Sequence, residues 1–184
     1  MVHLNFNPFP ILSTERLVLR RVTEADVQEM FVLRSDTEIM KYIPRPLATN
    51  FEEAIEHIKS IDEKIESSEG INWGITLKGN DTLIGVAGFY RISPENHRAE
   101  IGYILHPSQS GKGIISEVVK HLIEFGFTTM NLHSIEAVIA PENKASSKVL
   151  EKNGFVQEGL FKENQYFEGR FLDAAVYGLL NKRH

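Results

Sequence analysis

The amino-acid sequence predicts a mixed α+β fold, in which a central sheet of about seven strands is covered by helices on both faces. Two observations support this class. Strand-like runs rich in β-branched and aromatic residues fill the middle and the end of the chain, and segments with helical apolar periodicity are interspersed with them. The length of 184 residues suits one domain, spanning residues 1–184. A chain of this size buries about two-thirds of its unfolded surface without metals or crosslinks.

The first third of the chain predicts one strand and two helices. Alternating apolar residues between arginines predict a strand over residues 17–22, and Thr23 is suited to cap the helix that follows. Pro44 and Pro46 then interrupt the chain. A second helix, from Phe51 to about residue 67, carries alanine and isoleucines on one side, which predicts packing against a core.

The rest of the chain predicts six more strands and two more helices. Three strands come first, over residues 72–78, 82–92 and 99–106, separated by turn residues. A long helix follows Gly113, and after it come a strand over 135–140, a short capped helix within 143–155, and closing strands over 155–161 and 171–180. We expect Tyr166 and Phe167 in an aromatic loop between the last two strands.

The segment from Ser108 to Val119 reads SQSGKGIISEVV and predicts an anion-binding site. Gly111 and Gly113 allow successive backbone N–H groups to turn toward one point, because no Cβ obstructs them. The helix that follows adds unpaired N–H donors and the positive end of its dipole. A phosphate or pyrophosphate fits such a site.

Two common phosphate-binding motifs do not match this segment. A nucleoside triphosphate loop needs Ser or Thr after its lysine, and here Lys112 is followed by Gly113, so no hydroxyl is available for magnesium. A dinucleotide-binding loop needs a third glycine where Ser116 stands. The spacing therefore disfavours both nucleotide-binding interpretations.

The glycine segment instead resembles the pyrophosphate loop of the GCN5-related N-acetyltransferase superfamily. Three further segments resemble the branch of ribosomal-protein N-terminal acetyltransferases, in the same order along the chain: TERLVLR over 14–20, AEIGY over 99–103 and NKASSKVLEKNGF over 143–155. The resemblance covers roughly residues 11–180. It implies a mostly antiparallel sheet and acetyl-CoA as the cosubstrate.

The resemblance also assigns residues to acetyl-CoA. The pyrophosphate would lie on the backbone of Ser110, Gly111, Lys112, Gly113, Ile114 and Ile115. Ser110 replaces the usual Gln or Arg of the family, and Ile115 replaces a small residue. The pantetheine arm would run along the strand 99–106, contacting the backbone of Ile104 and Leu105, and Asn143 would also reach it while capping its helix.

Glu100 is the candidate general base, because amine attack on a thioester requires a proton acceptor within hydrogen-bond reach, directly or through water. His106 and a water molecule are the alternatives. By resemblance, Ser146 would protonate the departing thiolate. Other branches of the superfamily place a tyrosine seven residues after the asparagine, where this chain has Leu150, so the acid role falls to Ser146 or to a bound water.

The family builds its acceptor pocket from the loop between the first two helices and the last strand turn. This resemblance implies that Tyr42, Arg45, Trp73, Tyr166 and Phe167 line the pocket. The primary expectation is direct acetyl transfer to a primary amine, namely the N-terminal α-amine of a ribosomal or other protein. A small amine such as a polyamine or an aminoglycoside is an alternative acceptor. A non-catalytic acyl-CoA sensor and a phosphotransferase are the alternative functions.

Composition narrows the classes further. A net charge of −5 argues against nucleic-acid partners, which usually select a basic stripe, and favours a cationic acceptor only weakly. The chain has no cysteine, so disulfides, thiolate metal sites and a cysteine acyl-enzyme are excluded. Histidine spacing indicates no metal site. The sequence shows neither a basic leader nor an apolar run of membrane-spanning length, so we expect a cytoplasmic protein that does not bind membranes. A homodimer is the expected oligomeric state.

Overall fold

A computed structural model describes residues 1–182 of the chain. Its centre is an eight-stranded sheet in the order β1-β2-β3-β4-β5-β6-β8-β7, in which only the β5–β6 pair is parallel. The predicted class and the mostly antiparallel sheet are confirmed. The eighth strand, which the sequence did not predict, is β1, Leu12–Ser13. It is too short to give an alternating pattern.

The other strands follow the predicted runs closely. Their bounds are β2 Leu17–Arg20, β3 Ile71–Leu77, β4 Asn80–Ser93, β5 Arg98–Leu105, β6 Ser134–Ile139, β7 Val156–Phe167 and β8 Arg170–Leu180. The longer helices are α1 Val27–Ser35, α3 Phe51–Glu66, α4 Ile114–Thr128 and α5 Lys144–Lys152. No helix among residues 1–182 combines the length and apolar character that crossing a membrane requires.

The structure adds short helical segments to the predicted elements. A 3₁₀ turn, Glu24–Asp26, precedes α1, and the four-residue helix α2, Thr37–Met40, follows α1. Two further 3₁₀ turns, Pro94–Asn96 and Pro107–Gln109, flank β5. The side chain of Asp36 accepts hydrogen bonds from the backbone N–H groups of Glu38 and Ile39 and thereby starts α2. As a result, the segment between α1 and α3 folds across one end of the sheet.

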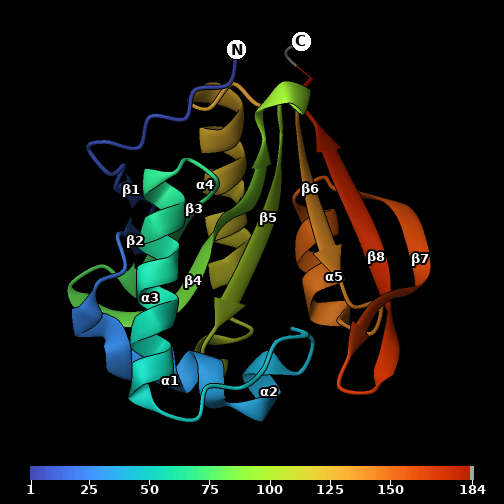
Figure 1. The fold of residues 1–184 in the computed structure, drawn as a ribbon. Helices are drawn as coiled ribbons and strands as arrows, with labels where there is room; N and C mark the ends of the chain where they lie inside the picture. The colour runs from blue at the N-terminus through green and yellow to red at the C-terminus, as the bar shows by residue number, and fades with distance from the viewer. Residues whose placement is uncertain (183–184) are drawn as a thin grey trace.

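Helices cover both faces of the sheet, as predicted. In Figure 1, α3 lies in front of the sheet beside α1, and α4 lies behind it. The α1 and α2 helices lie at the end of the molecule where β5 terminates. This arrangement places the C-terminal end of β5, the start of α4 and the α1–α2 segment near one another.

The parallel pair β5–β6 is short and then opens. Its paired residues are Arg98 with Ser134, Ala99 with Ile135 and Glu100 with Glu136. Beyond Glu100, β5 continues to pair with β4 on its other edge, while β6 pairs with β8 along its whole length. The backbone of β5 after Glu100 therefore has one edge without a strand partner, in the interior of the sheet.

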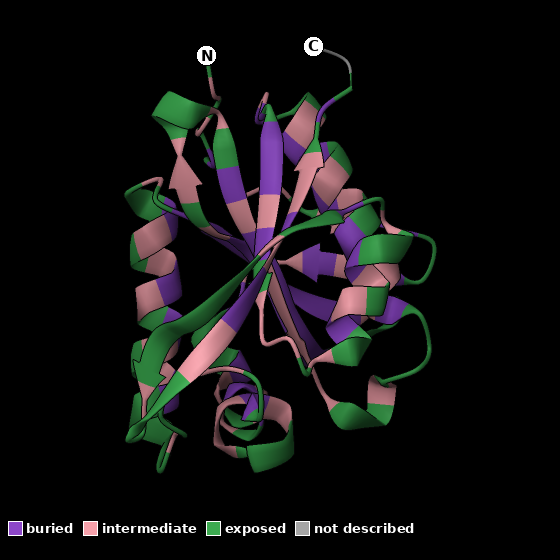
Figure 2. Ribbon diagram, turned by 90° about the vertical axis from the view of Figure 1, so that its right-hand side faces the viewer, coloured by how far each residue is buried: buried purple, intermediate pink, exposed green. Residues whose placement is uncertain are grey.

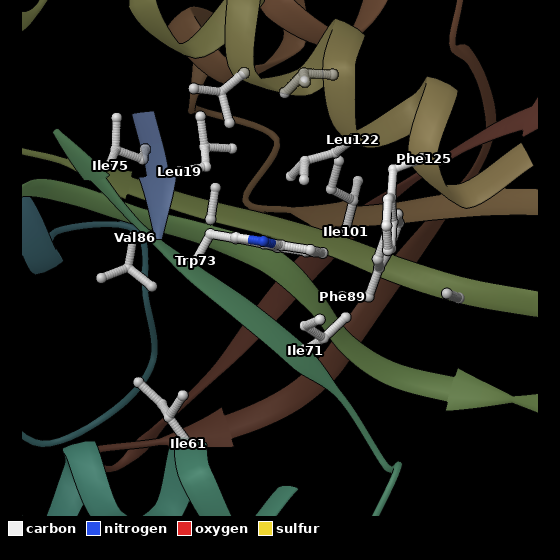
Figure 3. Packing of buried hydrophobic residues seen from close by; sticks show 14 of the residues in the cluster. Leu19, Ile61, Ile71, Trp73, Ile75, Val86, Phe89, Ile101, Leu122 and Phe125 are labelled. Carbon is white, nitrogen blue, oxygen red and sulfur yellow. The ribbon is translucent and has the colours of Figure 1, made fainter. Parts of the chain in front are cut away.

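The hydrophobic core centres on Trp73, which is fully buried (Figure 3). Its ring meets Phe125 of α4 edge-on, with centroids 5.2 Å apart, and lies 5.9 Å from the ring of Phe9. The indole N–H donates to the carbonyl oxygen of Pro10 at 2.6 Å. The expectation that Trp73 lines an acceptor pocket is therefore wrong, because its whole surface is used to join the sheet to α4.

The last two strands form a long hairpin at the margin of the sheet. Figure 2 shows buried residues concentrated in the central strands and a largely exposed β7–β8 hairpin. Tyr166 and Phe167 belong to β7, where they pair with Phe171 and Arg170. The expected aromatic loop at these two residues is therefore wrong, because the strand continues to a tight turn at Gly169.

We predict that Trp73→Ala lowers the free energy of unfolding by about 3–5 kcal/mol, since it removes a buried aromatic ring and leaves a cavity. Urea unfolding followed by circular dichroism measures the change. Tyr166→Ala is the matched control, because Tyr166 is 64% exposed, and we expect less than about 0.5 kcal/mol there. Equal destabilisation by the two substitutions would contradict this description of the core.

Candidate active site

A cavity of about 590 Å³ lies where β5 separates from β6. Its wall combines the β5 residues 100–105, the loop and first turn of α4, the start of α5, and the α1–α3 side of the sheet. Of the residues expected to bind acetyl-CoA and the catalytic candidates Glu100 and Ser146, all line this cavity except Lys112: Glu100, Ile104, Leu105, Ser110, Gly111, Gly113, Ile114, Ile115, Asn143 and Ser146. The fold thus brings together residues from three separate segments of the chain.

The glycine loop has the conformation that its sequence predicts. Gly111 and Gly113 have φ values of 74° and 75°, in the left-handed region that glycine adopts without strain. Gly113 is the N-cap of α4, a helix of 15 residues, and its carbonyl accepts the first helical hydrogen bond from Glu117. The loop residues line the cavity, and the first turn of α4 has backbone N–H groups without helical partners, which is the arrangement that an anion site requires.

The TERLVLR segment holds this loop in place. Thr14 and Arg16 both donate hydrogen bonds to the Glu117 carboxylate, and the Arg16 Nε–Glu117 Oε2 distance is 2.7 Å. Arg16 also donates to the carbonyl oxygen of Lys112, 2.9 Å away. Burial acts to raise the pKa of Glu117, but these hydrogen bonds hold that pKa below its usual value. The contacts connect the edge of the sheet to the loop and to the first turn of α4.

Lys112 differs from the other expected residues. Its ammonium group donates to Gln109 Oε1 at 3.0 Å, and its side chain is exposed rather than directed into the cavity. Its backbone carbonyl is held by Arg16. Lys112 is therefore placed to contribute its main chain to the loop, not its charge to the cavity.

Asn143 and Ser146 occupy the start of α5. The Asn143 side-chain oxygen accepts from the backbone N–H of Ser146 at 3.1 Å, which confirms the predicted N-cap. The Ser146 hydroxyl is buried and lies 2.6 Å from the Tyr103 hydroxyl of β5. Burial raises the pKa of Tyr103 to about 12, although its bond to Ser146 acts in the opposite direction.

Sequence reasoning did not select Tyr103. The strand pattern contained a signal for it, because side chains alternate along a strand and Tyr103 must point to the face opposite Glu100. Only the fold shows that α5 covers this face and that the Ser146 hydroxyl lies within hydrogen-bond distance of the Tyr103 hydroxyl. The pair forms a hydroxyl network directly beside the free edge of β5.

Glu100 lines the cavity from the other face of β5. Its side chain is 18% exposed, and its carboxylate lies 3.4 Å from the guanidinium of Arg91. Burial raises the pKa of Glu100 above its ordinary value; Arg91 opposes this shift, and the nearby Glu136 adds to it. A carboxylate with a raised pKa accepts protons more readily at neutral pH than an exposed one.

Gly102 lies between Glu100 and Ile104 on the same face of β5. A Cβ at this position would lie 2.7 Å from an edge carbon of the Tyr90 ring, so the glycine makes room for that ring. The irregularity in strand pairing occurs between Phe89 and Arg91 of β4 rather than at Gly102. Tyr90 therefore forms part of the cavity wall next to Glu100.

The alternative base, His106, makes its contacts in the turn that follows β5. It caps the 3₁₀ turn Pro107–Gln109, and its Nδ1 atom lies 2.7 Å from the Ser108 hydroxyl. His106 is not among the cavity-lining residues. Over residues 1–182, no His, Cys, Asp or Glu side chains form a group of three or more suited to a metal ion.

Of the residues expected to form the acceptor pocket, Tyr42 and Arg45 line the cavity. Tyr166 and Phe167 do not, because they belong to β7 at the margin of the sheet. Other polar cavity residues from the α1–α3 side are Arg34, His57 and Lys64, which the sequence did not single out because helical periodicity alone leaves them as solvent-facing positions.

A family model described as the acetyltransferase (GNAT) domain matches residues 16–156 of this chain. The protein belongs to the GNAT family of N-acetyltransferases. Among curated relatives, the uncharacterized N-acetyltransferase YoaA of Bacillus subtilis is 35% identical over 95% of this chain and 99% of its own length. The uncharacterized N-acetyltransferase p20 of Bacillus licheniformis is 38% identical over 94% of this chain and 97% of its own length.

The solved structures agree with the fold of this acetyltransferase. A GNAT acetyltransferase from Bacillus anthracis superposes with a TM-score of 0.83 at 30% identity, covering 93% of this chain and 98% of the other. A RimL ribosomal L7/L12 α-N-protein acetyltransferase in complex with coenzyme A superposes with a TM-score of 0.86 over 95% of this chain and all of the other, at 24% identity. At 24% identity, the likeness to the RimL structure shows a shared fold.

The cavity of this acetyltransferase fits acetyl-CoA. A Cβ added at Gly111 would meet nothing within 4 Å, so the loop is open on this side, and Gly111 itself lines the cavity. The unpaired edge of β5 at Ile104 and Leu105 offers backbone donors and acceptors to the amides of a pantetheine arm. Asn143 and the Tyr103–Ser146 pair lie at the far side of the same opening.

We predict that Arg16→Gln weakens CoA binding about fivefold, equal to about 1 kcal/mol, because the loop loses its attachment to β2. Glu117→Gln should have a similar effect, and the loss in the double variant should be smaller than the sum of the two, since both remove the shared Arg16–Glu117 ion pair. Isothermal titration with CoA measures the dissociation constants. Lys120→Gln, an exposed charge on the same helix, is the control. Unchanged affinity in both variants would contradict the role of this contact.

Proposed function

We propose that the acetyltransferase transfers acetyl from acetyl-CoA directly to the N-terminal α-amine of a protein, with ribosomal proteins as the acceptor class. One observation carries the proposal. A half-buried carboxylate, Glu100, and a hydroxyl pair, Tyr103 and Ser146, flank the opening of β5 on its two faces, beside the glycine loop. A proton acceptor and a proton donor are thus available on either side of the point where a thioester would lie.

Named relatives support an amine acceptor, which is a ribosomal protein for one of them and a polyamine for the other. The ribosomal-protein-serine acetyltransferase of Escherichia coli is 37% identical over 97 residues, which is 53% of this chain and 54% of that protein. The spermidine N(1)-acetyltransferase of Vibrio cholerae is 26% identical over 170 residues, 92% of this chain. We favour the protein N-terminus because the raised pKa of a single half-buried carboxylate suits a weakly basic amine.

The pKa of the amine explains this preference. An α-amine with a pKa of ~8 is about one-tenth neutral at pH 7, whereas a lysine amine with a pKa of ~10.4 must lose over 3 kcal/mol more to become neutral. Glu100 needs only to accept the proton that leaves the attacking nitrogen, directly or through a water molecule. The chain lacks cysteine, which supports direct attack by the amine rather than a cysteine relay.

Acetyl-CoA supplies the activated thioester, and the chain supplies orientation and proton transfer. The free N–H groups of β5 are suited to orient the thioester and to stabilise negative charge that develops on its carbonyl oxygen. In this proposal Ser146 donates a proton to the sulfur, and Tyr103, 2.6 Å away, orients the hydroxyl of Ser146. With a pKa of about 12, Tyr103 remains protonated at neutral pH and can replace the proton.

We predict that Glu100→Gln lowers kcat by about a hundredfold while the CoA dissociation constant stays unchanged, since general base catalysis contributes roughly 10²–10⁴. Because burial raises the pKa of Glu100, its active ionised form is lost as pH falls through a value above 4.5. The corresponding acidic limb of the kcat profile should disappear in Glu100→Gln. Steady-state thiol release measured across pH tests both the fall in kcat and the loss of the acidic limb. Unchanged turnover would exclude Glu100 from the reaction.

We predict that Ser146→Ala and Tyr103→Phe each lower kcat about tenfold or more, and that the double variant is close to the worse single one, because the hydroxyls act as a unit. Ser147→Ala, one residue along the same helix, is the control. Single-turnover measurements of thiol release separate this step from product release. Additive losses in the double variant would show that the hydroxyls act independently.

A further inference from the structure

The acceptor side of the cavity is electropositive, although the whole chain carries a net charge of −5. Four cationic side chains line the cavity: Arg34, Arg45, Lys64 and Arg91. Glu100 is the single carboxylate among the lining residues. This excess is local to the α1–α3 side, since the glycine loop contributes no cationic side chain to the wall.

Arg34 is the most informative of these residues. It is half-buried at the end of α1, and burial is the main reason that its pKa is lowered, followed by repulsion from Arg45. Its guanidinium donates one hydrogen bond, to the thioether sulfur of Met40 at 3.3 Å, which is a weak acceptor. Within residues 1–182, no carboxylate forms an ion pair with it.

Neighbouring groups report the same positive field. His57 of α3 has its pKa lowered to about 4, first by burial and then by Arg34, Arg45 and Lys64, so it is neutral at physiological pH. Burial raises the pKa of Tyr90 to about 12, while both arginines act to lower it. The Tyr90 hydroxyl therefore lies within the influence of both guanidiniums, and its ring extends back over Gly102 beside Glu100.

Structural roles do not account for this cluster. Arg34 lies in the last turn of α1, where a cation is favourable for the helix dipole, but this effect does not explain the approach of Arg45 and Lys64 from other segments. Glu100 is paired with Arg91 at 3.4 Å, so this one carboxylate does not compensate the charges of the other three cations. Like charges held together in a partly buried cavity are costly unless an anion joins them.

We propose that Arg34 and Arg45 bind an anionic group of the acceptor, a carboxylate or a phosphate located near the amine that is acetylated. This inference rests on the proposed function and specifies its substrate: a protein N-terminus with an acidic or phosphorylated residue within the first few positions. Arginine suits this task because its planar guanidinium binds both oxyanions through paired hydrogen bonds. Tyr90 lines the same cavity, its ring lies against Gly102, and both arginines act to lower the pKa of its hydroxyl.

The cluster also acts on the amine itself. Nearby positive charges favour the neutral form of an amine, which is the form that attacks. The same charges repel polyamines, whose remaining nitrogens are protonated. The anion of the acceptor thus supplies the attraction, and the arginines discriminate against acceptors without one.

The test uses peptides that share an N-terminal serine and differ only at the second residue, which is Asp, Asn, Lys or phosphoserine. We expect kcat/KM for the Asp or phosphoserine peptide to exceed that of the Asn peptide about tenfold or more, and the Lys peptide to be the poorest. Comparison of the Asp and phosphoserine peptides identifies which oxyanion is preferred. The ratio should fall with added salt, because the arginines are not deeply buried.

Variants assign the preference to the arginines. Arg34→Gln and Arg45→Gln should each reduce the Asp-to-Asn ratio to within about threefold, and Arg34→Lys should retain part of it, since the charge remains but the paired hydrogen bonds do not. Lys59→Gln, an exposed cation of α3 outside the cavity, should keep the full ratio. Titration of the same peptides into the CoA-saturated protein measures the preference as dissociation constants, independently of turnover.

The two proposals fail in different ways. If all peptides are acetylated at equal rates, or if the preference survives in the Arg34→Gln, Arg45→Gln double variant, the anion site is wrong and the proposed function stands. If no peptide is acetylated while CoA binds, the proposed function is wrong, and the titration then decides the anion site by itself. Efficient acetylation of spermidine, with no peptide turned over, would overturn both.

Discussion

The separation of β5 from β6 after Glu100 is the constraint on which the rest of the site depends. Three residue pairs hold the parallel strands together, and beyond them one edge of β5 has no partner. Backbone N–H and C=O groups in such a gap need a polar ligand or water, because unpaired groups are costly away from solvent. The cavity, the carboxylate and the hydroxyl pair all lie around this gap, and each face of β5 directs a different group into it. The proposed reaction centre is therefore a break in the pairing of the sheet, bordered by side chains that alternate along one strand.

A second set of contacts, made by Arg16 and Glu117, holds the glycine loop beside this gap. The loop at Gly111 and Gly113 depends on local conformation, but Arg16 and Glu117 fix it relative to the sheet across about a hundred residues of sequence. The N-terminal edge of the fold thus positions the loop that is proposed to bind the coenzyme, through contacts with Lys112 and Glu117. On the opposite side, α2 and the segment after it carry Tyr42 and Arg45 to the cavity, so the acceptor half depends on a part of the chain with little regular structure.

Local features were predictable from the sequence, and long-range ones were not. The left-handed conformation of the loop glycines and the Asn143 cap depend on nearest neighbours, and the structure shows both. Trp73 was misassigned because aromatic residues serve cores and pockets alike, and only the packing of α4 decides between them. Neither the Arg16–Glu117 pair nor the convergence of Arg34 with Arg45 has a signal in sequence spacing, since each joins segments that only the tertiary fold brings together.

The β7 strand has a further consequence for the behaviour of the protein in solution. It is a long marginal strand with exposed aromatic side chains, a form that commonly recruits strands from other molecules into aggregates. Two register shifts interrupt its pairing with β8, Glu163 adopts a φ of 51°, and Lys162 is paired with Asp173 close to this irregularity. A straight incoming strand cannot follow such a bent, charged margin over its full length. The irregularity therefore protects a hairpin whose flat form would be prone to intermolecular association.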